Sequence, residues 1–540
     1  TNFIFAQLLE LPKSILSPNS ASLGKYGDMP MNLYTGRANI DIPLYSLNEG
    51  DIPLDISLSY DTGGVRVNDV PGWVGQNWTL NAGGIITRSI RGKTFDELKF
   101  QGSGADVGQK GYYYHYQRLN TNDWNSFQNL KNLADLGYSY SEEHPDTYRM
   151  DLVPDIFTFN FMGITGKFFL GEDGEWKVSS QKNLKVKISE TDFVSALGMT
   201  YFGYYGSSST YRGLVIGKIE ITDDSGNKFV FGKTQNDIEF TIPGFDNQTT
   251  ASIFPNAWYL SEVYDKYGNK IYSFEYERGN DQVSLYPYLK NETYKRDKCG
   301  TLYSAFDYGN IEGNQTMEIT GDLIKPVFLK KINLIKSGNY IEFNSYNNNA
   351  LKYKRNTEET LDRYFYTKVD FFTNIPGGTG VSAWDYFKKF YFYTAHLPVN
   401  NGDPKNELAS ENRYFITGTN SYWDTMDLLF DSWKWRYLSA IYIKNSTGNT
   451  LKTIEFNYTN TPNVRLKLNN VNVDGTYKYS FEYNNFESLP PFTSKSFDHF
   501  GYYNGKQFNT SGQPGFNYSD YYSYRETDIN LVKYGSLTKI

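Results

Sequence analysis

The stretch LSEVYDKYGNKIYSFEY, from Leu260 to Tyr276, decides the fold. Apolar and aromatic residues alternate with polar ones on both sides of the pair Gly268-Asn269. Such alternation is typical of half-buried strands, and glycine supplies the positive φ that a tight turn between antiparallel strands requires. The stretch therefore predicts a β-hairpin whose returning strand ends in aromatic residues.

The same unit of strand, glycine turn and returning strand occurs at irregular intervals along the chain. Because an isolated hairpin is marginally stable in water, serial hairpins predict an extended sheet that curls on itself and can enclose a volume. The irregular spacing argues against a propeller with blades of fixed length. The further copies are Lys218–Phe231, Leu329–Phe343, Leu438–Tyr458 and Leu468–Tyr483.

Other segments also favour an all-β fold. Alternating apolar residues predict strands at Asn39–Tyr45, Ile52–Tyr60 and Asp155–Phe161. Only Asn125–Leu136 has helical spacing, with a capping residue at Asp123. Aromatic residues, which favour strands and packed β surfaces, make up 17% of the chain.

Composition excludes several classes of function. The formal net charge of -7, without a basic stripe, argues against a nucleic-acid partner. No stretch approaches the ~18 uncharged apolar residues of a membrane helix, so we expect no membrane span. The single cysteine, Cys299, excludes an internal disulfide framework.

We expect no catalytic residues, no metal and no cofactor. The sequence has no nucleophile elbow, phosphate-binding loop, zinc-protease motif or EF-hand. The four histidines, which lack zinc spacing, are His115, His144, His396 and His499. The acidic pairs Asp96-Glu97 and Glu142-Glu143 are poor candidates for the two carboxylates of a glycosidase, because adjacent strand residues point to opposite faces. We interpret both pairs as solvated loop charge. The chain is therefore predicted not to be an enzyme.

The glycine-rich segment Pro71–Arg88 contains the residues that we interpret as a structural motif. Its two tryptophans could stack on sugars, but glycine allows close backbone approach and favours buried rings. Arg88 and Arg91 are expected to pair with acidic residues. The motif residues are Gly72, Trp73, Gly75, Trp78, Gly83, Gly84 and Arg88.

Pro71–Arg88 resembles a signature of Rhs/YD-repeat secreted shell proteins, which include the shell components of insecticidal toxin complexes. Ser17–Gly36, which runs into the first predicted strands, resembles the opening of large Rhs-repeat proteins from bacteria with type IX secretion. Asp155–Phe168, Asp498–Gly505 and Gly535–Ile540 resemble landmarks that follow in the same order. The resemblance spans nearly the whole chain.

The resemblance implies a long antiparallel ribbon of hairpins that curls into a hollow Rhs-like shell around a polypeptide cargo. We expect residues 1–16 to hold a leader or signal-peptide remnant and an N-terminal strand. Residues 17–190 are expected to form a β-rich plug or entryway module, and residues 191–540 the start of the hairpin shell with insertions. Phe3–Gln7 is similar to the end of a signal peptide, although a hydrophobic strand would look alike.

The first hypothesis is therefore a non-enzymatic scaffold, secreted or on the cell surface, that encapsulates or presents a toxin or surface-protein effector. Its partner would be the C-terminal continuation of the same polypeptide or a separately secreted protein, with secretion machinery as a further candidate. The alternative is a cell-surface adhesin whose exposed tyrosines, as in Tyr112–Tyr116, bind glycans. A polysaccharide-degrading enzyme is the least favoured hypothesis.

Overall fold

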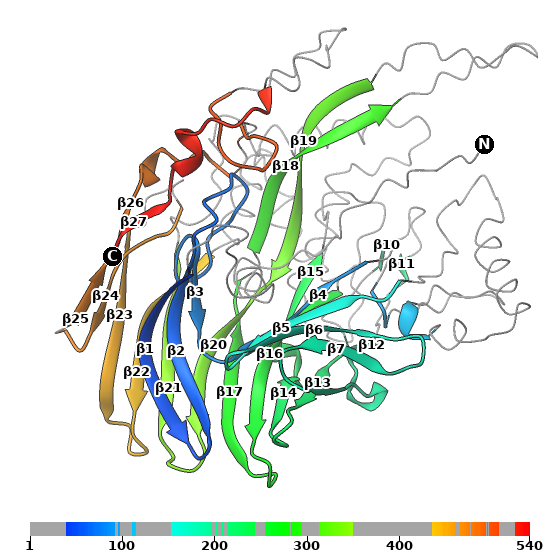
Figure 1. Ribbon diagram of the computed structural model, residues 1–540, viewed down its shortest axis with the longest axis vertical. Helices are drawn as coiled ribbons and strands as arrows, with labels where there is room; N and C mark the ends of the chain where they lie inside the picture. Colours follow the sequence, from blue (N-terminus) through cyan, green and yellow to red (C-terminus); the bar gives the residue numbers. More distant parts are fainter. Residues whose placement is uncertain are drawn as a thin grey trace, which may run out of the picture.

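The computed structural model (Figure 1) describes the chain in several ranges. These are residues 39–91, 95–97, 111–114, 153–195, 201–202, 208–209, 214–242, 254–280, 282–293, 313–348, 435–459, 465–475, 477–492, 494, 496–506 and 524–540. The predictions for residues 1–38, for the helix at 125–136 and for Cys299 lie outside these ranges.

Strands joined by antiparallel pairing form most of the described structure, which confirms the all-β prediction. One long sheet runs in the order β8-β13-β14-β16-β17-β20-β21-β22-β23-β24-β25. Its strands are β8 (Lys185–Lys187), β13 (Lys218–Thr222), β14 (Lys228–Gly232), β16 (Phe254–Tyr264), β17 (Lys270–Arg278), β20 (Val327–Leu334), β21 (Tyr340–Asn348), β22 (Trp435–Lys444), β23 (Thr450–Thr459), β24 (Lys467–Val473) and β25 (Tyr477–Ser480).

Strand β16 belongs to a second set of strands as well. Its first half pairs with β4 and β15, whereas its second half pairs with β14 and β17. The pairing joins strands from both sides of residue 190. The second set runs in the order β7-β6-β5-β4-β16-β15-β19-β18. Its other strands are β4 (Gly84–Ser89), β5 (Ile156–Phe161), β6 (Ile164–Leu170), β7 (Trp176–Ser180), β15 (Ile238–Ile242), β18 (Gln282–Thr293) and β19 (Gly313–Lys325).

A separate sheet at the N-terminal side lies against the long sheet. It consists of β1 (Asn39–Glu49), β2 (Ile52–Asp61) and β3 (Trp78–Asn81). The Tyr272 hydroxyl on β17 donates a hydrogen bond to the Ile52 carbonyl at 2.6 Å and accepts one from the Glu49 amide at 3.0 Å. These bonds hold the tip of the β1–β2 hairpin on the long sheet.

Short elements complete the described structure. They are β9 (Val194–Ser195) with β12 (Leu214–Val215), β10 (Tyr201–Phe202) with β11 (Ser208–Ser209), β26 (Glu482–Tyr483) with β27 (Leu537–Lys539), and the 3₁₀ turns η1 (Tyr112–Tyr114), η2 (Glu190–Asp192), η3 (Gln235–Asp237), η4 (Phe486–Ser488) and η5 (Leu531–Lys533).

All five predicted hairpins are confirmed as antiparallel pairs. Their turn glycines all have positive φ, as the sequence required; these are Gly226, Gly268, Gly338, Gly448 and Gly475. The predicted strands at 39–45, 52–60 and 155–161 are also present, as β1, β2 and β5.

Three of these hairpins have the same type of turn. In each, the side chain of an Asp or Asn accepts hydrogen bonds from the backbone amides two and four residues later, with glycine between them. Such side-chain caps fix the conformation of a turn locally. The acceptors are Asp223, Asp265 and Asn445, and Asp498 makes the same turn near the C-terminal end of the described chain.

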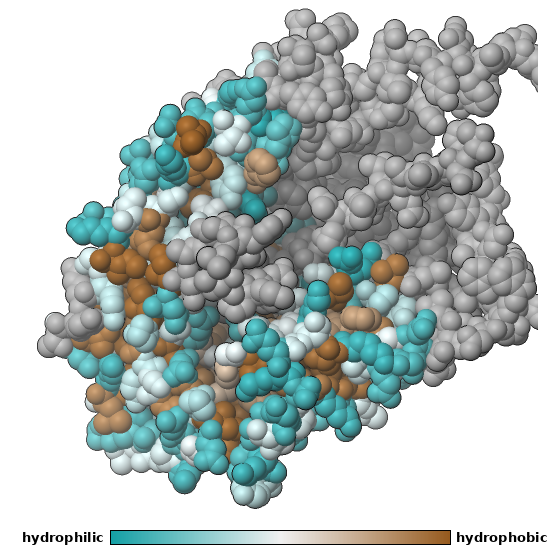
Figure 2. Space-filling model, viewed as in Figure 1, coloured by the Kyte–Doolittle hydropathy of each residue, from teal (hydrophilic) through white to brown (hydrophobic). Residues whose placement is uncertain are grey.

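Hydrophobic residues from all three sheets form one large core. Strands β5 and β13 show the strict alternation of buried and partly exposed residues that was expected from their sequences. On the face seen in Figure 2, hydrophobic residues reach the surface in groups between hydrophilic ones. Large exposed hydrophobic residues such as Tyr267 and Phe500 also occur.

Candidate functional site

The tryptophans of the glycine-rich motif lie in the core. Trp78 is 1% exposed and Trp73 is 8% exposed. The Trp78 ring packs at 4.6 Å from Phe481 and at 5.0 Å from Tyr60, measured between ring centroids. The Trp73 ring lies 5.5 Å from Phe328. Neither ring is available as a platform for sugars.

A tight loop positions these two rings. The Gly75 amide donates to the Gly72 carbonyl at 3.1 Å, and Gly75 has a φ of 110°. A Cβ atom at Gly75 would lie 3.3 Å from Leu468, so the loop packs directly on β24. Glycine at this position supplies both the conformation and the close approach.

Residues from the C-terminal part of the chain hold the same loop. The guanidinium of Arg465 donates to the backbone carbonyls of Val67 and Asp69. The amide of Gln76 donates to the Leu466 carbonyl at 2.8 Å. Charge-assisted hydrogen bonds of this kind are stronger than neutral ones. Arg465 therefore holds the loop close to the long sheet.

The next two glycines of the motif permit close packing of neighbouring strands. A Cβ atom at Gly84 would lie 2.3 Å from the Cβ atom of Phe161 on the adjacent strand β5. Gly83 has a φ of 144°, and its Cβ position lies 3.1 Å from the ring of Phe274. A larger residue would displace the backbone of Phe161 at the first position and the ring of Phe274 at the second.

Arg88 is the centre of a buried cluster of charged residues. Its Nη2 atom donates to Glu97 Oε2 at 2.7 Å, and its Nε atom lies 3.5 Å from Asp155 Oδ2. Asp155 and Asp96 also accept each other's backbone amides, at 3.1 and 3.0 Å. Each of the four residues is at most 1% exposed.

Aromatic rings enclose the guanidinium of Arg88. The ring centroids of Phe157 and Trp258 lie 4.8 and 4.9 Å from its central carbon. The second carboxylate oxygen of Glu97 accepts the backbone amide of Ile216 at 3.0 Å. The cluster thus joins β4, the segment 95–97, the start of β5 and the entrance to β13.

The burial of these carboxyl groups changes their acidity. Desolvation by burial raises the pKa of Asp155 to about 7, although the Arg88 charge opposes this shift. Burial and the neighbouring Asp155 charge also raise the pKa of Asp96 well above its usual range. Asp96 and Asp155 therefore do not both ionise easily beside Arg88.

The interpretation of Asp96 and Glu97 as solvated loop charge is wrong. Both residues are 0% exposed in the core, where Glu97 accepts from Arg88 and Asp96 accepts from the Asp155 amide. Nothing in the pair itself distinguished the two environments, but the expected pairing of Arg88 with acids was the useful signal. The pair Glu142-Glu143 lies outside the described residues.

The cluster contains residue types that are common in active sites, but its buried, hydrogen-bonded geometry indicates a structural role. Its carboxylates are fixed by backbone amides and by Arg88, and no side chain in it reaches solvent. Buried charges of this kind are stable only when they are paired and hydrogen-bonded. In the folded protein the cluster holds four segments of backbone together.

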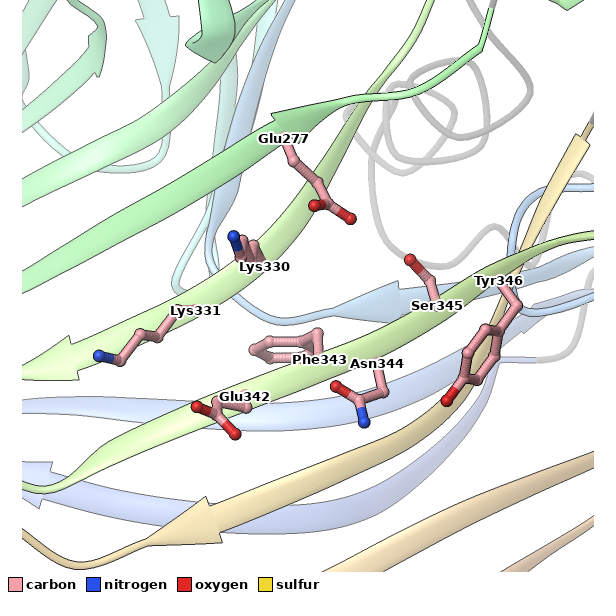
Figure 3. Close-up of a pocket in the computed structure, with 8 residues that line it drawn as sticks. All are labelled: Glu277, Lys330, Lys331, Glu342, Phe343, Asn344, Ser345 and Tyr346. Carbon is pink, nitrogen blue, oxygen red and sulfur yellow. The ribbon is translucent and has the colours of Figure 1, made fainter. Parts of the chain in front are cut away.

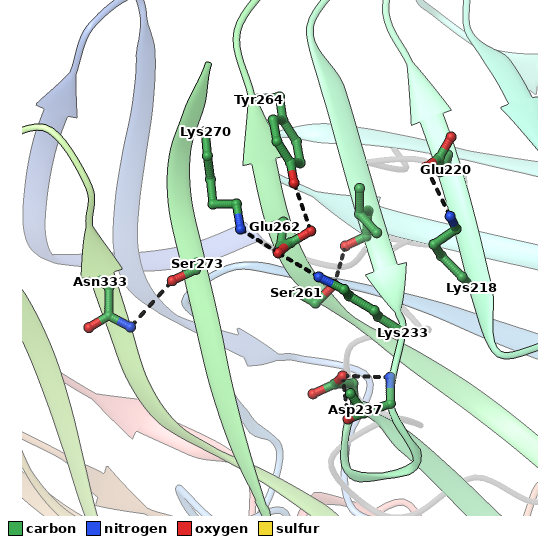
Figure 4. A network of polar contacts seen from close by, with 12 residues as sticks. Lys218, Glu220, Lys233, Asp237, Ser261, Glu262, Tyr264, Lys270, Ser273 and Asn333 are labelled. Carbon is green, nitrogen blue, oxygen red and sulfur yellow. Dashed lines mark hydrogen bonds and ion pairs between the residues drawn. The ribbon is translucent and has the colours of Figure 1, made fainter. Parts of the chain in front are cut away.

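A second polar network lies on the partly exposed face of the hairpins (Figure 4). The carboxylate of Glu262 accepts hydrogen bonds from Lys270 at 2.6 Å, from Lys233 at 2.9 Å and from the Tyr264 hydroxyl at 2.9 Å. Burial opposes ionisation of Glu262, but these bonds outweigh it and lower its pKa to about 2. The network joins the residue that follows β14 to β16 and β17.

A surface pocket of about 310 Å³ opens beside β20 and β21 (Figure 3). Lys330 and Lys331 line it from β20, while Glu342, Asn344 and Tyr346 line it from β21. No sequence motif connects these residues. They meet only through strand pairing.

The prediction of exposed tyrosines at 112–116 is wrong for Tyr112, which is 3% exposed. Its backbone neighbour Gly111 packs against the carbonyls of Phe95 and Asp96, which leaves this turn inside the structure. Tyr113 and Tyr114 are half-buried. His115 and Tyr116 lie outside the described residues.

Among the described residues, no group of three or more His, Cys, Asp and Glu side chains is placed to hold a metal ion. Of the four histidines in the sequence, His499 alone lies within the described ranges. Its backbone amide donates to the Arg525 carbonyl at 3.1 Å. No helix in the described part of the chain is long and apolar enough to span a membrane.

Comparison with known proteins gives no assignment: no protein-family model matches the chain, and no curated protein matches it.

Proposed function

We propose that the chain is a non-enzymatic β scaffold of the Rhs/YD-repeat kind, secreted or displayed on the cell surface, that encapsulates or presents a polypeptide. The observation that carries the proposal is the long sheet of serial hairpins, several of which have the same type of capped turn. Such a ribbon extends by repetition and can curl into a hollow shell.

The buried cluster supports a structural role. Its acidic residues are the described carboxylates that most resemble catalytic groups, since burial raises the pKa values of Asp96 and Asp155. Their side chains are sealed from solvent and hold backbone amides instead. The buried charged residues thus join segments of the scaffold.

The open edge of the long sheet supports a polypeptide partner. In the residue-by-residue pairing of the described strands, β25 is paired with β24 alone. Unpaired backbone groups at a sheet edge are a template for a further strand. That strand would come from the continuation of the same polypeptide or from a separately secreted protein.

Purification of the tagged chain from its native source tests this proposal. Mass spectrometry would identify bound polypeptides, any continuation and the mature N-terminus, with an unrelated tagged secreted protein as the control. We expect a bound polypeptide that resists protease until the sheet is unfolded. A chain that is stable, monomeric and without a bound polypeptide would contradict the scaffold proposal and favour a binding module.

The second candidate function is a cell-surface binding module. Burial of Tyr112 removes part of the reason for it, but the surface pocket provides a new one. Tyr346, which lines this pocket, is 55% exposed and offers an aromatic face to a ligand.

A further inference from the structure

The pocket of Figure 3 forms where two strands of the long sheet diverge. Strand β20 pairs with β21 over Lys331–Asn333 and Tyr340–Glu342, and no further. Beyond that point β21 continues along β22, whereas the preceding part of β20 pairs with β17. The pocket occupies the resulting gap in the sheet.

Two β-bulges flank this gap. In the pairing of β17 with β20, Glu275 and Tyr276 face Lys331 and Leu329, so Lys330 is the extra residue. In the pairing of β21 with β22, the register shifts between Asn344 and Ser345. Bulges bend a strand and redirect side chains, and they are frequent beside functional sites.

The charges around the pocket are unequal. Its two carboxylates are engaged, since Glu277 pairs with Arg436 and Glu342 pairs with Lys444 at 2.5 Å. Neither pocket lysine has an ionic partner among the described residues: Lys331 lies over the Tyr340 ring, and Lys330 is exposed. The pocket therefore presents a surplus of positive charge to a ligand.

The remaining lining groups suit a saccharide. Tyr346 lies at one end of the row of labelled residues in Figure 3 and Lys330 toward the other, with Asn344 on the strand between them. An exposed aromatic face stacks on a sugar ring, and an amide both donates to and accepts from hydroxyl groups. The volume lies at the small end of the usual range for ligand pockets.

We propose that this pocket binds an acidic saccharide, with the sugar ring against Tyr346, its hydroxyls on Asn344 and its carboxylate on Lys330. The inference rests on the second candidate function and names its ligand class. Its three named contacts, Lys330, Asn344 and Tyr346, are exposed residues of the pocket lining.

Titration of the intact chain with oligogalacturonates and with their carboxyl-reduced, neutral counterparts tests the proposal. We expect the acidic ligand to bind about tenfold more tightly than the neutral one, because it gains a charge-assisted contact. Lys330→Gln should remove most of that preference, and Tyr346→Ala should weaken both ligands by about tenfold.

Matched variants outside the pocket serve as controls. Lys336→Gln removes an exposed lysine from the β20–β21 turn, and Tyr267→Ala removes a tyrosine that is 77% exposed in another turn. Both should bind as the unaltered chain does. Equal binding of acidic and neutral ligands would overturn the proposed carboxylate contact.

The two levels of the proposal fail in different ways. Saccharide binding that survives both Lys330→Gln and Tyr346→Ala would overturn the assignment of this pocket but leave the binding-module function standing. No binding of any oligosaccharide, on a broad glycan array as well, would overturn both.

Discussion

The indole nitrogen of Trp78 donates a hydrogen bond to the hydroxyl of Tyr483 at 2.8 Å, across 405 residues of sequence. The same hydroxyl donates to the Leu468 carbonyl at 2.7 Å. Burial raises the pKa of Tyr483, which keeps its proton available for this bond. The pair joins β3 of the N-terminal sheet to β26 and, through the Leu468 carbonyl, to β24 of the long sheet.

The first prediction concerns this pair. Trp78→Ala should lower the free energy of unfolding by ~3 to 5 kcal/mol, because it leaves a cavity beside Phe481 and Tyr60. Tyr483→Phe should cost about 1 to 3 kcal/mol, since the indole N–H then lacks its partner. Denaturant unfolding measures both, and Tyr267→Phe, at an exposed turn, should change little. An unaltered unfolding midpoint for Trp78→Ala would contradict the structural role of the motif.

The second prediction concerns Arg88. Arg88→Met should lower the free energy of unfolding by ~3 to 5 kcal/mol, because Glu97 and Asp155 stay buried without their cation. The control is Arg91→Met, at an exposed side chain, which should change stability by less than ~0.5 kcal/mol. Urea unfolding measures both variants. Similar losses in the two would show that the buried pairing of Arg88 does not contribute to the free energy of unfolding.

The third prediction concerns pH. Burial raises the pKa of Asp155 to about 7, whereas an unfolded aspartate titrates near ~3.9. The folded chain thus holds more protons between these values, so this group's contribution to stability is largest at low pH and falls as pH rises toward 7. Between pH 5 and pH 8, ionisation of Asp155 should lower the free energy of unfolding of the unaltered chain by an amount on the order of 3 kcal/mol. Asp155→Asn should remove this part of the pH dependence.

Urea unfolding at the two pH values checks this expectation. Asp224→Asn, at an exposed turn position, is the control and should keep the pH dependence of the unaltered chain. An Asp155→Asn variant with that same pH dependence would mean that Asp155 is ionised throughout the range.

The fourth prediction concerns Glu262, whose pKa of about 2 lies below that of an unfolded glutamate. Its contribution is fully present above the unfolded pKa and is lost as pH falls through the folded one. Glu262→Gln should therefore cost about 1 kcal/mol at pH 7, because the side chain is only 11% exposed, and almost nothing at pH 2. Thermal unfolding at both pH values, with exposed Glu190→Gln as the control, measures this difference.

The hairpins were predictable because their signals are local. Gly268 and Gly448 adopt the positive φ that their turns require, and the strands on either side alternate as expected. The capped turn adds Asp265 and Asn445 to this signal, three residues before each glycine. Period and turn chemistry depend on a few neighbouring residues, so the sequence displays them directly.

The candidate sites were not predictable because they arise from strand order. Asp155 meets Asp96 across 59 residues, and nothing near either position records this approach. Strand β16 divides its pairing between two sets of strands without a visible break in its sequence pattern. The pocket at Lys330 likewise depends on where β20 and β21 part, which tertiary pairing decides.

The contacts of Tyr60 have a consequence for folding kinetics. Its hydroxyl donates to the Gly535 carbonyl and accepts from the Leu537 amide, positions 475 and 477 residues further along the chain. Contacts this distant in sequence require large loops to close and are associated with slow folding. The N-terminal sheet can therefore reach its final packing only after the segment around Gly535 arrives. Until then its hydrophobic face is exposed to competing associations, so a chain interrupted before that point would be prone to aggregate.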